Sequence, residues 1–113
     1  MNAREKLIVK YVTDLKEKCN VNPDVDLLRK VTIGCGPAIY NSDSSTISGT
    51  NESELNTVRN KFLIKKLGLS TDDKLDEGID AVIEQYGRSN RHKYRVVFYY
   101  LLVLHFGKES VYE

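Results

Sequence analysis

Apolar residues recur every three or four positions along most of the chain, and this spacing is typical of helices. It predicts a first helix from about Ala3 to Lys18, whose apolar face is made by Ile8, Tyr11, Val12, Leu15 and Cys19. A second helix is expected to begin at Asn22-Pro23, because asparagine caps helix N-termini and proline suits the first helical position. It should stop at Gly36-Pro37, and residues 38–40 could add a short helical turn.

A polar stretch rich in serine and threonine, residues 41–50, follows the second helix and is expected to be a loop. Ile47 is the one apolar residue in this stretch, and it is expected to anchor the loop to the core. The third helix should begin at Asn51, with Glu54 three residues further on in a capping-box arrangement. This helix should end at Gly68, in the left-handed conformation that glycine adopts easily.

The fourth helix is expected to start at Ser70 or Thr71. Two aspartates would then lie in its first turn, where the helix dipole favours negative charge. Apolar residues at helical spacing continue to Gly87, which should end the helix. Gly78 lies at the edge of the apolar face and would allow another helix to approach closely.

The fifth helix is expected to run from Ser89-Asn90 to Phe106, with Gly107 as its cap. From Val96 to Phe106 only His105 is polar, and a helix that is apolar all round is expected to be buried all round. No strand is expected. The fold predicted for residues 1–113 is therefore a single, compact, all-α domain, a five-helix bundle with the hydrophobic C-terminal helix at its centre.

Charge and composition narrow the classes of function. Lysine and arginine total 17 against 16 for aspartate and glutamate, a net charge of +1, which argues against coating nucleic acid or an anionic membrane. The N-terminus lacks the apolar run of a signal peptide, and the longest apolar run, Val96–Leu104, is too short to cross a bilayer. A cytoplasmic protein with free thiols at Cys19 and Cys35 is expected.

Several blocks of the sequence carry a family resemblance. They are the C-terminal YGRSNRHKYRVVFYYLLVLHFGKESVY, the internal NKFLIKKLGL from Asn60 to Leu69, and the N-terminal blocks DLKEKC, DLLRKV and GPAIY. These blocks resemble the bacterial family DUF2853, and the C-terminal block is the most specific of them. The resemblance implies a compact, multi-helical, bacterial cytoplasmic protein, and it brings no activity, cofactor or catalytic residue to this chain.

The segment Arg88–Arg95, RSNRHKYR, holds four fixed positive charges and a histidine at the expected start of the last helix. Cations are disfavoured there, because the helix dipole is already positive at its N-terminus. Free N–H groups, polar side chains and guanidinium groups could together bind a phosphate or carboxylate, and an aromatic ring one turn on could stack a base. The predicted anion-binding residues are Arg88, Ser89, Asn90, Arg91, His92, Arg95 and Tyr99.

The alternative is that these cations are neutralised within the chain, since structural ion pairs produce similar clusters. Six carboxylates of the predicted fourth helix could serve as partners: Asp72, Asp73, Asp76, Glu77, Asp80 and Glu84. A second basic stretch, made by Lys61, Lys65 and Lys66, is expected to be a solvated face of the third helix.

The spacing of histidine and cysteine predicts no metal site and no cofactor. His92 and His105 are 13 residues apart, and the chain has no HxxxH, HExxH or CxxC spacing. Cys35 lies between two glycines, but without a base placed beside it a packed thiol is expected rather than a nucleophile. Gly34 and Gly36 follow a helix and lack the third glycine of a dinucleotide-binding loop. No catalytic residue is assigned.

The sequence therefore favours a non-enzymatic binding or interaction module, whose basic segment binds an anionic group of a nucleic acid, a metabolite or a protein partner. One alternative is a small enzyme in which His92 acts as acid or base while Arg88, Arg91 or Arg95 binds a substrate anion. Another is a purely structural homo-oligomer, such as a homodimer. It would be built on the first helix or on the apolar tail at Val111-Tyr112, which should dock on the body or on a second subunit.

Overall fold

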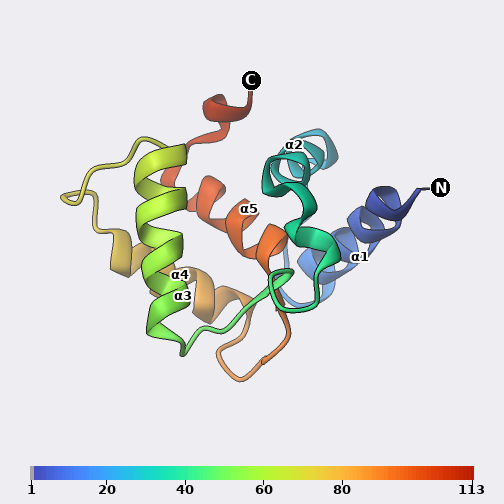
Figure 1. Cartoon of the computed structure of the whole chain (residues 1–113), viewed down its shortest axis with the longest axis horizontal. Coiled ribbons are helices and arrows are strands. Elements are labelled where there is room, and N and C mark those ends of the chain that lie inside the picture. Colours follow the sequence, from blue (N-terminus) through green and yellow to red (C-terminus); the bar gives the residue numbers. More distant parts are fainter. Residues whose placement is uncertain (1) are drawn as a thin grey trace.

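The computed structural model describes residues 2–113, and most of them lie in helices (Figure 1). The α-helices are α1 (Ala3–Glu17), α2 (Val25–Cys35), α3 (Glu52–Thr57), α4 (Leu75–Tyr86) and α5 (Arg95–Phe106). The other helical segments are the 3-10 helices η1 (Gly36–Tyr40) and η3 (Glu109–Tyr112) and the π-helix η2 (Val58–Lys66). Two strands, β1 (Thr46–Ile47) and β2 (Lys93–Tyr94), also form. The mainly helical class is confirmed, whereas the expectation of no strand is wrong.

The helix α5 lies between α4 and α2 in Figure 1, and it also contacts α1. Its continuous apolar sequence suits this position, because a helix without a polar face can bury residues on every side. Its buried residues are Val96, Val97, Phe98, Tyr100, Leu101, Leu102 and Val103. The hydroxyl of Tyr100 accepts a hydrogen bond from the N–H of Asp24 at 2.9 Å, so even its polar tip is satisfied. Within residues 2–113, every helix is too short or too polar to cross a bilayer.

The helix α2 begins later than the sequence pattern predicts. Its N-cap is Asp24 rather than Asn22, because the Asp24 carboxylate accepts a hydrogen bond from the N–H of Leu27 at 3.2 Å. The predicted stop is confirmed: Gly36 follows the last residue with φ at +63°, which a residue with a side chain rarely adopts. The short turn expected at residues 38–40 is part of η1.

The helix α4 also begins later than predicted, at Leu75 rather than at Ser70 or Thr71. The Asp73 carboxylate accepts a hydrogen bond from the N–H of Ser70 at 2.6 Å, which closes a local turn before the helix. Lys74 then takes a left-handed conformation, with φ at +56°, immediately before the first helical turn. The aspartates expected in that turn therefore lie outside it.

The predicted third helix is α3 continued by the π-helix η2. Its start is confirmed, because Asn51 accepts a hydrogen bond from the N–H of Glu54 at 3.2 Å. The reciprocal half of a capping box is missing, since the Glu54 carboxylate accepts the N–H of Ser48 instead, at 2.6 Å. The end at Gly68, with φ at +75°, is also confirmed. The spacing of apolar residues does not predict the change from α to π geometry at Val58.

The strands β1 and β2 pair antiparallel, with Thr46 opposite Tyr94 and Ile47 opposite Lys93. Ile47 is 1% exposed, which confirms that it anchors the polar loop to the core. This short ladder ties the loop before α3 to the segment before α5. It therefore sets where both segments lie.

The C-terminal tail docks on the body of the same chain, which was one of the two alternatives predicted from the sequence. Val111 and Tyr112 are half-buried and pack against the core. Nζ of Lys66 lies 5.1 Å from the centre of the Tyr112 ring, a cation–π contact that helps to hold the tail.

The close helix contact expected at Gly78 is present, and it generates a stability prediction. A Cβ at Gly78 would lie 2.2 Å from Cζ of Phe106. Gly78→Ala should therefore lower the free energy of unfolding by about 1–3 kcal/mol, as overpacking does. The matched control is Gly34→Ala in α2, where a Cβ would be 3.7 Å from Tyr112, an ordinary contact. That variant should be at least as stable as the parent, because alanine favours helix. Urea unfolding measures both, and equal stabilities would contradict the packing of Phe106 on Gly78.

Candidate anion-binding site

Most of the predicted anion-binding residues lie in the connection between α4 and α5, not in a helix. The N–H of Asn90 donates to the carbonyl of Gly87 at 2.9 Å, and the Asn90 side-chain oxygen accepts the N–H of His92 at 3.0 Å. These turns replace the helical hydrogen bonds expected from Ser89 onward. The predicted helix start at Ser89-Asn90 is therefore wrong: Arg95 is the first residue of α5, whereas Arg88, Arg91 and Lys93 precede the helix.

Two hydrogen bonds of one hydroxyl, that of Tyr86, hold the end of this connection. The N–H of Tyr94 donates to the hydroxyl of Tyr86 at 3.0 Å, and that hydroxyl donates to the buried carboxylate of Asp14 in α1. Burial and the hydrogen bond to Asp14 raise the pKa of Tyr86 above its ordinary value, so the phenol stays protonated. A chain of contacts thus links α1, α4 and β2.

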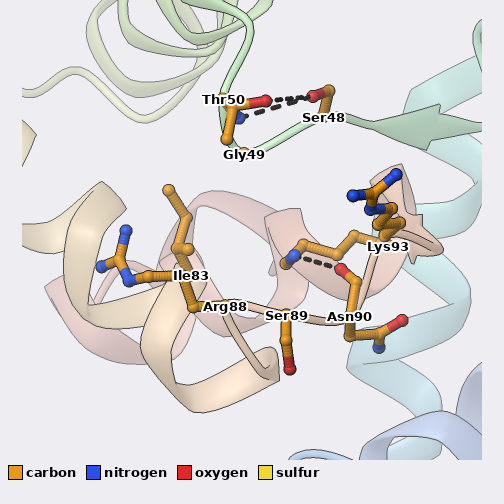
Figure 2. A pocket seen from close by; sticks show the side chains of 9 residues that line it. Ser48, Gly49, Thr50, Ile83, Arg88, Ser89, Asn90 and Lys93 are labelled. Atoms are coloured by element: carbon orange, nitrogen blue, oxygen red, sulfur yellow. Dashed lines mark hydrogen bonds between the residues drawn. The ribbon is translucent and has the colours of Figure 1, made fainter.

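The connection and the turn before α3 enclose a cavity of about 590 Å³ (Figure 2). Residues 48–50 form one side, residues 88–91 form the other, and Ile83 and Lys93 complete the lining. The ladder between β1 and β2 brings the two sides together, since both segments adjoin its strands. The cavity therefore combines the serine and threonine loop with the basic segment.

Arg88 is neutralised by carboxylates of α4, as the alternative interpretation of the sequence expected. Its guanidinium group pairs with Asp80 at 2.6 Å and with Glu84. Both hydrogen bonds raise the pKa of Arg88 above its ordinary value, so it is a fixed cation. Arg91 differs, because within residues 2–113 no carboxylate oxygen lies within 4.0 Å of its guanidinium nitrogens.

Sequence reasoning left five lining residues out of the site: Ser48, Gly49, Thr50, Ile83 and Lys93. Lys93 is the only one of these five that carries a charge. It is 3% exposed, and no carboxylate of the described chain lies within 4.0 Å of its ammonium group. Nζ donates to the carbonyl of Asn90, and Figure 2 shows the side chain extending towards that carbonyl between the two sides of the cavity. Burial, and then the nearby charge of Arg88, lower the pKa of Lys93. The cavity is thus lined by a buried cation that lacks an anionic partner.

The comparisons with known proteins place the chain in a family. Residues 10–110 match the family described as "Protein of unknown function (DUF2853)". The chain belongs to the DUF2853 family. No curated protein matches it. The matched range contains both sides of the cavity and the whole of α5, so the site lies within the part of the chain that this DUF2853 protein shares with its family.

Arg95 and Tyr99 do not line this cavity. The Nε of Arg95 donates to the carbonyl of Ser44 at 2.7 Å, and Nη1 donates to the hydroxyl of Tyr99 at 3.0 Å. Both residues line a second cavity, which shares no lining residue with the first. Arg95 and Tyr99 therefore lie together, at a different place from residues 88–91.

His92 lies outside both of these cavities. Its side chain is exposed, and its ring packs edge-on against Tyr94 with the ring centres 4.6 Å apart. Both cysteines of the DUF2853 protein are free thiols, and burial raises the pKa of Cys19 to about 12 and that of Cys35 to about 11. These thiols are therefore protonated at neutral pH and weak as nucleophiles. Within residues 2–113, no three histidine, cysteine, aspartate or glutamate residues are grouped as a metal would need.

The buried hydroxyl of Tyr86 should stabilise the fold more than an exposed hydroxyl does. Tyr86→Phe leaves the buried carboxylate of Asp14 and the N–H of Tyr94 without this partner. The free energy of unfolding should fall by about 1–3 kcal/mol. The matched control is Tyr40→Phe, since Tyr40 is 57% exposed, and it should change stability little. Guanidinium unfolding followed by circular dichroism compares them; two variants of equal stability would contradict the role given to Tyr86.

Proposed function

We propose that this DUF2853 protein is a non-enzymatic binding module, and that its cavity between residues 48–50 and 88–91 receives an oxyanion such as a phosphate group. The observation that carries the proposal is the buried ammonium group of Lys93, which lines the cavity without a carboxylate partner. A buried charge costs free energy unless an opposite charge or several hydrogen bonds compensate it. An anion in the cavity would supply that compensation.

The hydrogen-bonding capacity of Lys93 supports the same proposal. An ammonium group has three hydrogens, and the carbonyl of Asn90 is the acceptor that the described chain provides. Two of the three ammonium hydrogens are then free to donate to a bound anion. The pKa of Lys93 is lowered by burial and by Arg88, and an anion beside it would act in the opposite direction.

The rest of the lining suits an oxygen-rich anion. Arg91 has no carboxylate partner in the described chain, and its guanidinium group can bind two oxygens at once. Ser48 and Thr50, whose hydroxyl groups are 3.1 Å apart, belong to the side of the cavity opposite residues 88–91. The cavity volume of about 590 Å³ exceeds that of an inorganic phosphate, so a phosphate that carries an organic group would fit.

The other two functions inferred from the sequence have less support. An enzyme that uses His92 would need its imidazole at the anion, but His92 does not line the cavity and packs against Tyr94. A homo-oligomer built on the tail would need that tail free for a partner, and Tyr112 is half-buried on its own chain. Light scattering at two protein concentrations separates a monomer from an oligomer.

Phosphate should stabilise the parent protein, and Lys93→Met should abolish this effect. At a phosphate concentration one hundred times the dissociation constant, the gain in unfolding free energy is about 2.7 kcal/mol. Without phosphate, Lys93→Met should be within about 1 kcal/mol of the parent, since it removes an uncompensated buried charge together with one hydrogen bond. Thermal unfolding at neutral pH, with and without phosphate at constant ionic strength, measures both effects.

The control is Lys10→Met, because Lys10 is an exposed residue of α1 outside the cavity. It should keep the whole phosphate effect, although it changes the net charge as Lys93→Met does. Phosphate stabilisation that is equal in both variants, or absent from the parent, would contradict the proposed site. A large loss of stability in Lys93→Met without phosphate would show that Lys93 serves the fold instead.

A further inference from the structure

A second cavity, of about 460 Å³, lies where the C-terminal end of α2, the π-helix η2, α5 and η3 meet. It does not share a lining residue with the cavity of the proposed function, and the inference below is independent of that function. Its lining includes three aromatic residues and three cationic residues. No aspartate or glutamate is among the residues that line it.

The π-helix explains why these residues meet. In η2 the N–H of Leu67 donates to the carbonyl of Phe62 at 2.9 Å, five residues back. Residues five apart are then nearly above one another, whereas in an α-helix they are turned by about 140°. Thr57 and Phe62 are five apart, and so are Lys61 and Lys66, and all four line the cavity. The π geometry thus gathers an aromatic ring and two lysines on one side, and short π segments are frequent at functional sites.

The apolar part of the cavity is built from aromatic rings. Phe62 and Tyr99 stack with ring centres 3.8 Å apart and planes at 11°. Tyr112 closes the cavity from the docked tail, and burial raises its pKa to about 12, so its phenol is neutral at physiological pH. Such a surface fits a flat apolar body better than it fits a hydrated ion.

The polar part of the cavity is positive. Lys61, Lys66 and Arg95 line it, and within residues 2–113 none of them has a carboxylate oxygen within 4.0 Å. The Nε of Arg95 donates to a backbone carbonyl, and its Nη1 donates to the hydroxyl of Tyr99. Within residues 2–113, its Nη2 hydrogens have no acceptor. The thiol of Cys35, whose pKa burial raises to about 11, is protonated and adds no negative charge.

We propose that this second cavity binds a small organic anion whose carboxylate lies among Lys61, Lys66 and Arg95 and whose aromatic body lies against Phe62, Tyr99 and Tyr112. The volume is within the range of cavities that enclose small molecules. The carboxylate is held by charge and by the free guanidinium hydrogens. The body is held by burial of apolar surface, so both halves of the ligand are required.

The test uses 2-naphthoate as the probe and 2-naphthalenemethanol as its neutral counterpart of similar shape. Binding of each to the whole protein is followed by two-dimensional amide NMR. Naphthoate should shift amides of residues 57–66 and of α5, and it should bind about tenfold more tightly than the alcohol, because the alcohol lacks the charge.

The variants separate the site from general attraction to a basic protein. The double variant Lys61→Gln with Lys66→Gln should weaken naphthoate binding by about three- to tenfold. Lys65→Gln is the control, because Lys65 is an exposed neighbour on the same helix that does not line the cavity. It should leave the affinity unchanged. The amide spectrum of the double variant should show the tail still docked, because Tyr112 also packs against the core without its contact to Lys66.

Three results would overturn the proposal. They are equal affinities for naphthoate and the alcohol, equal effects of the double variant and Lys65→Gln, and amide shifts confined to α1, around the exposed residue Val9. Lys93→Met should leave naphthoate binding intact. Loss of phosphate stabilisation without loss of naphthoate binding would therefore keep the two proposals distinct.

Discussion

The burial of the Lys93 ammonium group is the constraint on which this account depends. Lys93 is 3% exposed, its Nζ donates to one backbone carbonyl, and the like charge of Arg88 lowers its pKa further. A sequence could avoid this cost by placing an apolar residue at the position, since β2 would pair with β1 equally well. The free-energy cost of burying the Lys93 charge would be offset if an anion bound beside it. The proposed oxyanion site therefore explains why a lysine occupies this position of the fold.

The geometry around Lys93 depends on contacts between distant parts of the chain. Pairing of Ile47 with Lys93 fixes the loop before α3 against the segment before α5. The Tyr86 hydroxyl, bonded to Asp14, holds the next residue of that segment through the N–H of Tyr94. The apolar surface of α5 supplies the burial that makes these polar contacts strong. The same strand pair separates residues 88–91 from Arg95, so one basic run in the sequence becomes part of two cavities. One cavity suits a compact oxyanion, and the other suits an aromatic carboxylate.

The sequence predicted the features that depend on local chemistry. The first helix, the glycine ends at Gly36, Gly68, Gly87 and Gly107, the Asn51 cap and the Ile47 anchor were all visible in residue type and spacing. It missed the starts of α2 and α4, which local hydrogen bonds to Asp24 and Asp73 decide, and it also failed where a distant partner decides. The helix α5 starts only at Arg95, because the Asn90 side chain bonds the backbone of His92 and the following residues pair with Thr46 and Ile47 of a distant strand. The same error hid Lys93, since helical spacing gave no reason to bury it. The change to π geometry at Val58 could not be predicted, because the apolar spacing of an α-helix continues through it.

The measurement that tests the central claim most directly is an NMR titration of the Lys93 Cε and Nζ signals with pH, in the absence and in the presence of phosphate. The account predicts a Lys93 pKa below its ordinary value of 10.5 in the free protein and a clear rise when phosphate binds. The sign follows from charge, because an anion beside the ammonium group favours its protonated form. A Lys93 pKa that matches the exposed lysines, or that phosphate leaves unchanged, would contradict the account.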